Sequence, residues 1–179
     1  MKRLSWILLL IGLSASAPKI PAGMVKAHKI TFKIKNAGIT VDGLLSDLKA
    51  EIRFDPKALD KSELRASVAV ATIKTGIKMR DRDLQGSKYF YVEKYPQIKM
   101  VSKKIKDMGK DQYKGTFALT IRDVTKEVEV PFTYTQAKGI GTFKGNFTID
   151  RRDFGVGGNS IILSDNVKIF IELTAEKRD

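Results

Sequence analysis

The residues with the clearest chemical potential are two pairs of carboxylates, since paired acids perform general acid–base work in glycosidases. The pairs are Asp81 with Asp83 and Asp150 with Asp153. Each pair has arginine neighbours in the sequence, and these are Arg80, Arg82, Arg151 and Arg152. Because a neighbouring guanidinium stabilises the ionised form of a carboxylate, such acids are poorly suited to deliver protons. The pattern therefore favours structural ion pairs over a catalytic dyad.

Few other groups for catalysis or metal binding are present. The chain has a single histidine, His28, and no cysteine. These counts exclude disulfide bonds, thiol nucleophiles and cysteine-ligated metals, and they leave no pair of histidines for a zinc site. A Ser-His-Asp triad would have to use His28, for which the sequence indicates no buried orienting acid. We therefore expect no enzyme activity, no metal and no cofactor.

The charge of the chain is strongly positive, with 33 Lys and Arg against 20 Asp and Glu among 179 residues. Many lysines alternate with apolar residues, and examples are Lys29, Lys33, Lys35, Lys99 and Lys144. A solvated sheet exterior explains this pattern without a partner. Exposed aromatics do not alternate with the bases, so binding of nucleic acid is not expected. Weak contact with anionic membranes or polymers remains open.

The first 17 residues have the three parts of a secretory signal peptide. Lys2 and Arg3 precede an apolar run from Leu4 to Leu13, and the small residues 15–17 follow as a cleavage box. About ten apolar residues are too few for a spanning helix, which needs ~20. We expect a signal peptide over 1–17 and one soluble domain over 18–179 that is periplasmic or secreted. The lack of cysteine fits a bacterial periplasm.

Most of the remaining chain alternates between apolar and polar residues with the period of a β-strand. The alternating runs span 28–35, 39–43, 48–54, 64–70, 98–105, 113–121, 128–134, 143–149 and 167–173. Short turn signals separate them, which is typical of an antiparallel sandwich or barrel. The sequence therefore predicts an all-β protein.

One segment, residues 76–96, lacks this alternation. Ile77, Arg80, Asp81 and Leu84 have helical spacing, which predicts a short helix that ends near Gly86. The segment is either a surface crossover between two sheets or a lid over a cavity, and both readings remain open. We expect Arg80 and Asp81 to anchor it through charged hydrogen bonds.

The inward positions of the strands carry bulky aromatic side chains. They include Phe32, Phe54, Phe117, Phe132, Phe143 and Phe147. A barrel of about eight strands is wide enough to hold one small ligand. The same alternation would also describe a solid core, so a filled and a hollow interior both remain open at this point.

Several short motifs occur in an order that resembles the YceI-like family, also called the polyisoprenoid-binding YceI domain. They include Val41-Asp42-Gly43, Ile52-Arg53-Phe54-Asp55-Pro56, Met79-Arg80-Asp81, Glu93-Lys94-Tyr95-Pro96 and Arg152-Asp153-Phe154-Gly155. The resemblance implies a lipocalin-like antiparallel β-barrel of about eight strands with a short helical crossover. It also implies an exported, non-enzymatic protein that holds a polyisoprenoid or another long-chain lipid in an internal apolar tunnel.

This resemblance implies roles for individual residues. The tunnel lining would comprise the six phenylalanines named above together with Leu84 and Phe90. Arg80, Asp81, Tyr89 and Tyr95 would anchor the crossover or cover the tunnel mouth. The chain departs from the family pattern at Asp83, where histidine is common, and at Asp123, where glycine is common. These departures affect the chemistry expected around a lipid head group.

A different kind of function is also compatible with the sequence. The alternative is a basic exported module that binds anionic polymers or membrane surfaces through its exterior. The identity of the lipid, transport as against storage, and formation of a homodimer are left open by the sequence.

Overall fold

The computed structural model describes residues 22–176. The predicted signal peptide over residues 1–17 lies outside the described residues. The strands are β1 (Met24–Asn36), β2 (Ile39–Leu45), β3 (Leu48–Arg53), β4 (Glu63–Ala69), β5 (Gln97–Gly109), β6 (Gln112–Ile121), β7 (Val124–Ala137), β8 (Ile140–Asp150) and β9 (Leu163–Glu176). The helix is α1 (Lys78–Gln85), and short 3-10 turns are η1 (Leu59–Lys61), η2 (Val70–Thr72) and η3 (Arg151–Phe154).

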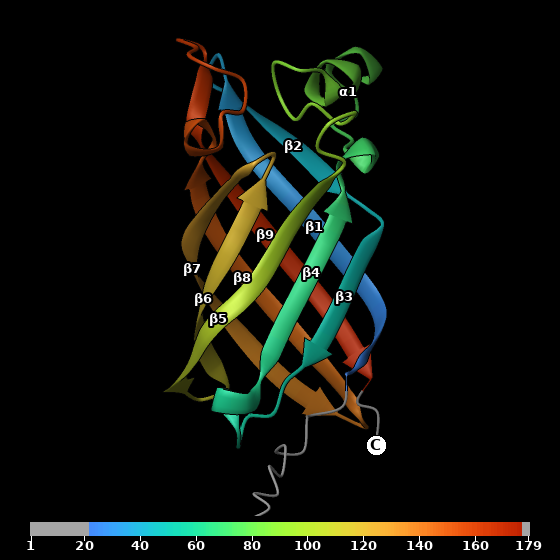
Figure 1. Cartoon of the computed structure of the whole chain (residues 1–179), viewed down its shortest axis with the longest axis vertical. Coiled ribbons are helices and arrows are strands. Elements are labelled where there is room, and N and C mark those ends of the chain that lie inside the picture. Colours follow the sequence, from blue (N-terminus) through green and yellow to red (C-terminus); the bar gives the residue numbers. More distant parts are fainter. Residues whose placement is uncertain (1–21, 177–179) are drawn as a thin grey trace, which may run out of the picture.

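All nine strands form one antiparallel sheet in the order β2-β1-β9-β8-β7-β6-β5-β4-β3. The sheet curls strongly, so that its two edges approach each other (Figure 1). A bridge between Gly23 and Ile52 and another between Leu44 and Lys74 join the two edge regions. The predicted all-β, barrel-like antiparallel fold with a short helix is confirmed, with nine strands in place of about eight.

Side-chain alternation explains why the sheet curls around a core. Along β6, every second residue from Tyr113 to Ile121 is buried, whereas the residues between them are more exposed. β5 has a register shift against β6 between Ser102 and Lys104, and the strand continues through it. A bulge of this kind bends a strand and increases its twist, which helps a single sheet to close on itself.

A cluster of aromatic rings fills the interior at one end of the curled sheet. Phe54 meets Tyr113 at 5.2 Å and Tyr134 at 4.7 Å between ring centroids. Phe143 lies 4.7 Å from Tyr134 and 5.3 Å from Phe54. These separations are typical of favourable aromatic pairs, so this end of the sheet has a solid core.

The segment without alternation forms the connection between β4 and β5. Its α1 helix ends at Gly86, as predicted. Because β4 and β5 are hydrogen-bonded neighbours in the one sheet, the connection leaves and re-enters that sheet, so of the two open readings a crossover between two sheets does not apply. The Val70 amide donates to the Pro96 carbonyl at 2.9 Å, which closes the base of this excursion. Figure 1 shows α1 at the same end of the sheet as the β1–β2 turn.

Arg151 is the buried charge of the described chain, with 3% of its surface exposed. Its guanidinium donates to the carbonyls of Val156 at 2.8 Å, Gly158 at 2.6 Å, Leu163 at 3.1 Å and Ser164 at 3.0 Å. It also donates to Asp165 Oδ1 at 2.9 Å. All five N–H groups of a guanidinium are thereby used, and together they hold the loop between η3 and β9 against the sheet.

We predict that Arg151→Met lowers the free energy of unfolding by about 3–5 kcal/mol, because it leaves the four carbonyls that accept from the buried guanidinium without that donor and removes one of the two partners of Asp165. Arg152→Met is the matched control, since Arg152 pairs with the same Asp165 at 2.9 Å but has 49% of its side chain exposed. The control should cost at most about 1 kcal/mol. Urea denaturation measures both, and equal losses would contradict a special role for Arg151.

Candidate ligand-binding cavity

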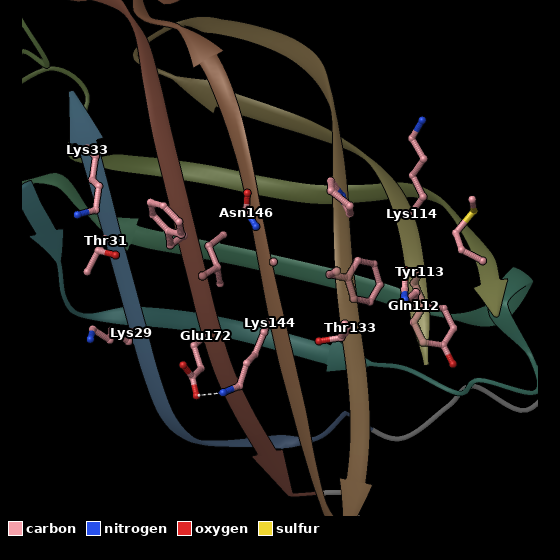
Figure 2. Close-up of a pocket in the computed structure, with 16 residues that line it drawn as sticks. Lys29, Thr31, Lys33, Gln112, Tyr113, Lys114, Thr133, Lys144, Asn146 and Glu172 are labelled. Atoms are coloured by element: carbon pink, nitrogen blue, oxygen red, sulfur yellow. Dashed lines mark ion pairs between the residues drawn. The ribbon is translucent and has the colours of Figure 1, made fainter. Parts of the chain in front are cut away.

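A groove and a cavity lie on opposite sides of the sheet. The first is an open groove of about 770 Å³ on the outer face of β1, β9, β8, β7 and β6. Lys29, Lys33, Lys114 and Lys144 line it together with Glu172 (Figure 2). Its lysines and threonines face water, so hydrocarbon placed there would stay largely hydrated.

Carboxylates neutralise most of the lysines in this outer groove. Lys33 pairs with Asp42 at 2.7 Å, and Lys114 pairs with Glu129 at 2.6 Å. Lys144 pairs with Glu172 at 2.9 Å, as the dashed line in Figure 2 marks. Exposed pairs of this kind add little stability, but they leave the groove with little net charge.

The second hollow lies inside the curl of the sheet and has a volume of about 420 Å³. That size falls in the range of about 300–1,000 Å³ that is typical of small-molecule sites. Its wall is mainly aliphatic, with contributions from Ile30, Ile34, Val41, Leu45, Ile73, Ile98, Ile121, Ile149, Val156, Leu163, Val167 and Ile169. Ile77, Met79 and Asp83 line it and are exposed to solvent, so the cavity opens beside α1.

The structure separates the predicted tunnel residues into three groups. Phe32, Leu84 and Phe90 line the cavity. Phe117 and Phe147 belong to the buried cluster beside it. Phe54, Phe132 and Phe143 pack in the aromatic cluster at the other end, so they lie outside the wall of this cavity. Ring-to-ring contact fills the interior there, which is why the predicted long tunnel is a shorter cavity in this structure.

One cavity residue owes its position to a glycine on the neighbouring strand. Phe32 of β1 lies opposite Gly43 of β2 in the register of the two strands. A Cβ atom at position 43 would overlap the Phe32 ring. The glycine therefore allows the ring to lie flat against β2 and leaves the space beside it open.

Thr75 is the point at which α1 is tied to the connection. The Arg80 side chain donates from Nε to Thr75 Oγ1 at 2.7 Å and from Nη2 to the Thr75 carbonyl at 2.8 Å. Asp81 Oδ1 accepts from the Thr75 amide at 2.8 Å and from its hydroxyl at 2.5 Å. Arg80 and Asp81 are thus joined through Thr75, and no ion pair between them occurs within residues 22–176.

The aromatic residues predicted at the mouth take different places. Tyr89 lines the cavity with Phe90. The Tyr95 hydroxyl donates to Asp123 Oδ2 at 2.8 Å, so Tyr95 connects the end of this segment to the β6–β7 turn and does not line the cavity. This hydrogen bond lowers the pKa of Asp123 below its usual value. The departure from the family pattern at Asp123 therefore supplies the acceptor for Tyr95.

The sequence did not predict some of the residues that line the cavity. Arg151 was expected in an ion pair but not in the cavity wall, and its donors are all used by the loop that it holds. Ile73 and Thr75 follow the irregular turn η2, where no alternation marks their direction. A sequence signal did exist for Val167 and Ile169, which alternate on β9.

The described residues also bear on other types of site. Across residues 22–176, no group of three or more His, Cys, Asp or Glu side chains has an arrangement that could hold a metal ion. His28 lies exposed on β1. Within the same described range, none of the helices has the length and apolar character needed to span a bilayer.

Comparison with solved structures supports the fold assignment. The crystal structure of BcnA from Burkholderia cenocepacia has a TM-score of 0.79 at 30% sequence identity, covering 83% of this chain and 96% of that one. The YCEI protein of Campylobacter jejuni has a TM-score of 0.72 at 26% identity, covering 98% of this chain and 100% of its own. A polyisoprenoid binding domain from Saccharophagus degradans has a TM-score of 0.71 at 12% identity, over 90% of this chain and 100% of that domain, which is a likeness of fold alone.

Sequence comparison extends this relationship. A UPF0312 protein from Pseudomonas savastanoi pv. phaseolicola is 27% identical over 139 residues, which cover 72% of this chain and 71% of that protein. The model of the YceI-like domain matches residues 24–175, from the start of β1 to the end of β9. The chain therefore belongs to the YceI-like domain family, as its ordered motifs predicted.

Proposed function

We propose that this protein binds a long-chain isoprenoid or a similar amphiphilic lipid in the inner cavity, as an exported carrier or store and not as an enzyme. The observation that carries the proposal is the cavity of about 420 Å³ with its mainly aliphatic wall. Burial contributes about 0.8 kcal/mol for each methylene group removed from water. A hydrocarbon chain is therefore the ligand whose binding free energy is most favourable against this wall.

The polar groups of the cavity suit an amphiphile. Arg80 and Asp83 lie on α1, where the cavity opens. Arg80 uses two of its five N–H groups on Thr75, and the other three lack a partner among the described residues. A polar or anionic head group at the opening would accept from these donors while its chain lies in the aliphatic interior.

The choice of an isoprenoid among amphiphiles rests on the family. This fold is shared with a domain that is described as polyisoprenoid binding. Methyl branches spaced along an isoprenoid chain would also fit a wall built mostly from branched isoleucine, valine and leucine side chains. Export is proposed from the signal peptide pattern of residues 1–17.

The alternative function, binding of anionic polymers through the exterior, has weaker support. The outer groove is the natural place for it, since Lys29, Lys33, Lys114 and Lys144 lie there. Three of these four lysines are paired with carboxylates. A polyanion would have to displace those carboxylates before it could form ion pairs with the lysines.

Our first test of the proposal compares native and denatured mass spectra of gently purified protein. We expect a lipid adduct in the native spectrum that survives washing at 1 M NaCl. Salt at that concentration shortens the screening length to about 3 Å and weakens contacts between charges, but it does not weaken apolar burial. Equal native and denatured masses over several preparations would contradict lipid binding. Salt-sensitive binding of a polyanion without lipid would instead favour the alternative.

A second prediction concerns the volume of the cavity. Val41→Trp places an indole in the wall on the edge strand β2 and should sharply reduce the lipid-bound fraction, because the ring occupies the space of the chain. Thr40→Trp is the matched control, since Thr40 is exposed on the same strand and absent from the wall. Native mass spectrometry gives both fractions. The same lipid content in both variants would argue against this cavity as the site.

A third prediction concerns Arg80. Because Arg80 ties α1 to Thr75 through two charge-assisted hydrogen bonds, Arg80→Ala should cost about 1–3 kcal/mol and loosen lipid retention as well. Arg82→Ala is the control, as Arg82 is exposed on the same helix. Thermal melting and retained lipid are measured on the same samples. Lost lipid at unchanged melting temperature would make Arg80 a head-group ligand without a scaffold role.

A further inference from the structure

Large apolar side chains are exposed around the opening of the cavity. Ile161 and Ile162, in the loop before β9, have 104% and 57% of their surface exposed. On the connection, Ile77 and Met79 are 52% and 66% exposed. Ile39 at the start of β2 is 71% exposed. We call these five residues the apolar rim. Single exposed apolar residues are ordinary, whereas a group of them around a cavity opening marks an interaction surface.

Hydrogen bonds and cavity contacts place the rim at one end of the molecule. The Ala37 amide in the β1–β2 turn donates to the Ile162 carbonyl at 2.7 Å, so this turn and the loop before β9 lie together. Ile77 and Met79 line the cavity along with Asn36 and Leu163, which belong to the same turn and loop. Figure 1 shows the turn, the loop and α1 at the upper end of the sheet.

The two sides of the rim differ in charge. From Phe154 to Ser164 the chain has no charged residue, so Ile161 and Ile162 lie in an uncharged loop. Exposed bases surround the rest of the opening, and they are Lys35, Lys74, Lys78, Arg82 and Lys88. Exposed acids at this end are Asp83, Glu93, Asp123 and Asp153, and Asp123 already accepts a hydrogen bond from Tyr95.

These bases differ from the lysines of the outer face. Lys33, Lys114 and Lys144 each have a carboxylate partner within 4.0 Å. None of the five bases at the opening takes part in an ion pair within the described part of the chain. Their charge is therefore available to an anionic partner, whereas carboxylates neutralise most of the lysines in the outer groove.

We propose that the apolar rim docks on an anionic lipid bilayer, with the isoleucine loop entering the acyl boundary and the surrounding bases contacting lipid phosphates. This inference rests on the proposed function, since a bound chain would then pass between membrane and cavity without crossing water. Interfacial binding of this kind combines buried apolar area with attraction to anionic lipids.

A bilayer fits the rim better than a second copy of this chain does. A two-fold dimer buries the same patch from both partners, so it would bring the unpaired bases of each close together. Like charges that face each other without counter-charges oppose such contact. A bilayer that contains anionic lipid supplies both the apolar phase and the phosphates that these two parts of the surface require.

The test measures sedimentation of the full mature chain with vesicles of phosphatidylglycerol and phosphatidylcholine at equal amounts, and with pure phosphatidylcholine vesicles. We expect binding to the anionic vesicles, and the double variant I161S/I162S should weaken it roughly tenfold or more, given the gain from burying each isoleucine. Raising NaCl to 1 M should weaken binding by the wild type. The matched control is M108S/I140S, which removes two apolar side chains that are 60% and 40% exposed at the β5–β6 and β7–β8 turns. These turns lie at the end of the sheet opposite α1 (Figure 1).

Lipid retention by native mass spectrometry, measured on the same samples, separates this inference from the proposed function. Retained lipid with no vesicle binding would overturn the docking inference and leave the proposed function intact. Equal losses in I161S/I162S and M108S/I140S would also overturn it, because binding would then not be localised to the rim. Sedimentation velocity provides a further check, since a dimer that I161S/I162S abolishes, without vesicle binding, would assign the rim to a second copy.

Discussion

The dominant constraint on this molecule is that one sheet must bury its own inner face. Within residues 22–176 the nine-stranded antiparallel sheet has no second layer, so it can remove its apolar side chains from water only by curling. Alternation along each strand supplies the inner face, and the bulge at Ser102 adds local bending. The result is an enclosed interior whose contents depend on the size of each inward side chain and on how far apart the opposing strands lie.

The two ends of this interior are packed differently. Around Phe54, rings from β6, β7 and β8 meet across the curl at 5–6 Å and leave a solid core. Toward α1, the inward residues are mostly aliphatic and the Phe32 ring lies flat over Gly43, so space remains. The aromatic end stabilises the fold, and the aliphatic end is therefore free to remain hollow at a smaller cost in stability.

Sequence reasoning predicted the part of this arrangement that depends on local spacing. Alternation identified the strands and the inward phenylalanines, and the spacing of Ile77 and Leu84 identified α1. The same alternation describes Phe32 and Phe143 equally well, although one lines the cavity and the other packs in the ring cluster. That difference depends on which strands face each other across the curl, which is a non-local property. Likewise, Arg151 was expected to pair with a neighbouring acid, whereas its partner is Asp165 on β9.

Arg151 also links the stability of the fold to the form of the opening. Its guanidinium holds both ends of the loop that presents Ile161 and Ile162, through the Val156 and Leu163 carbonyls. The loop can therefore expose isoleucines to solvent without collapsing into the cavity beneath it, because its ends are fixed by buried charge-assisted hydrogen bonds. On the other side of the opening, α1 is fixed through Thr75 by the side chains of Arg80 and Asp81. Because α1 has no fully buried residue whereas Arg151 is 3% exposed, we expect local opening to favour α1 over the loop before β9.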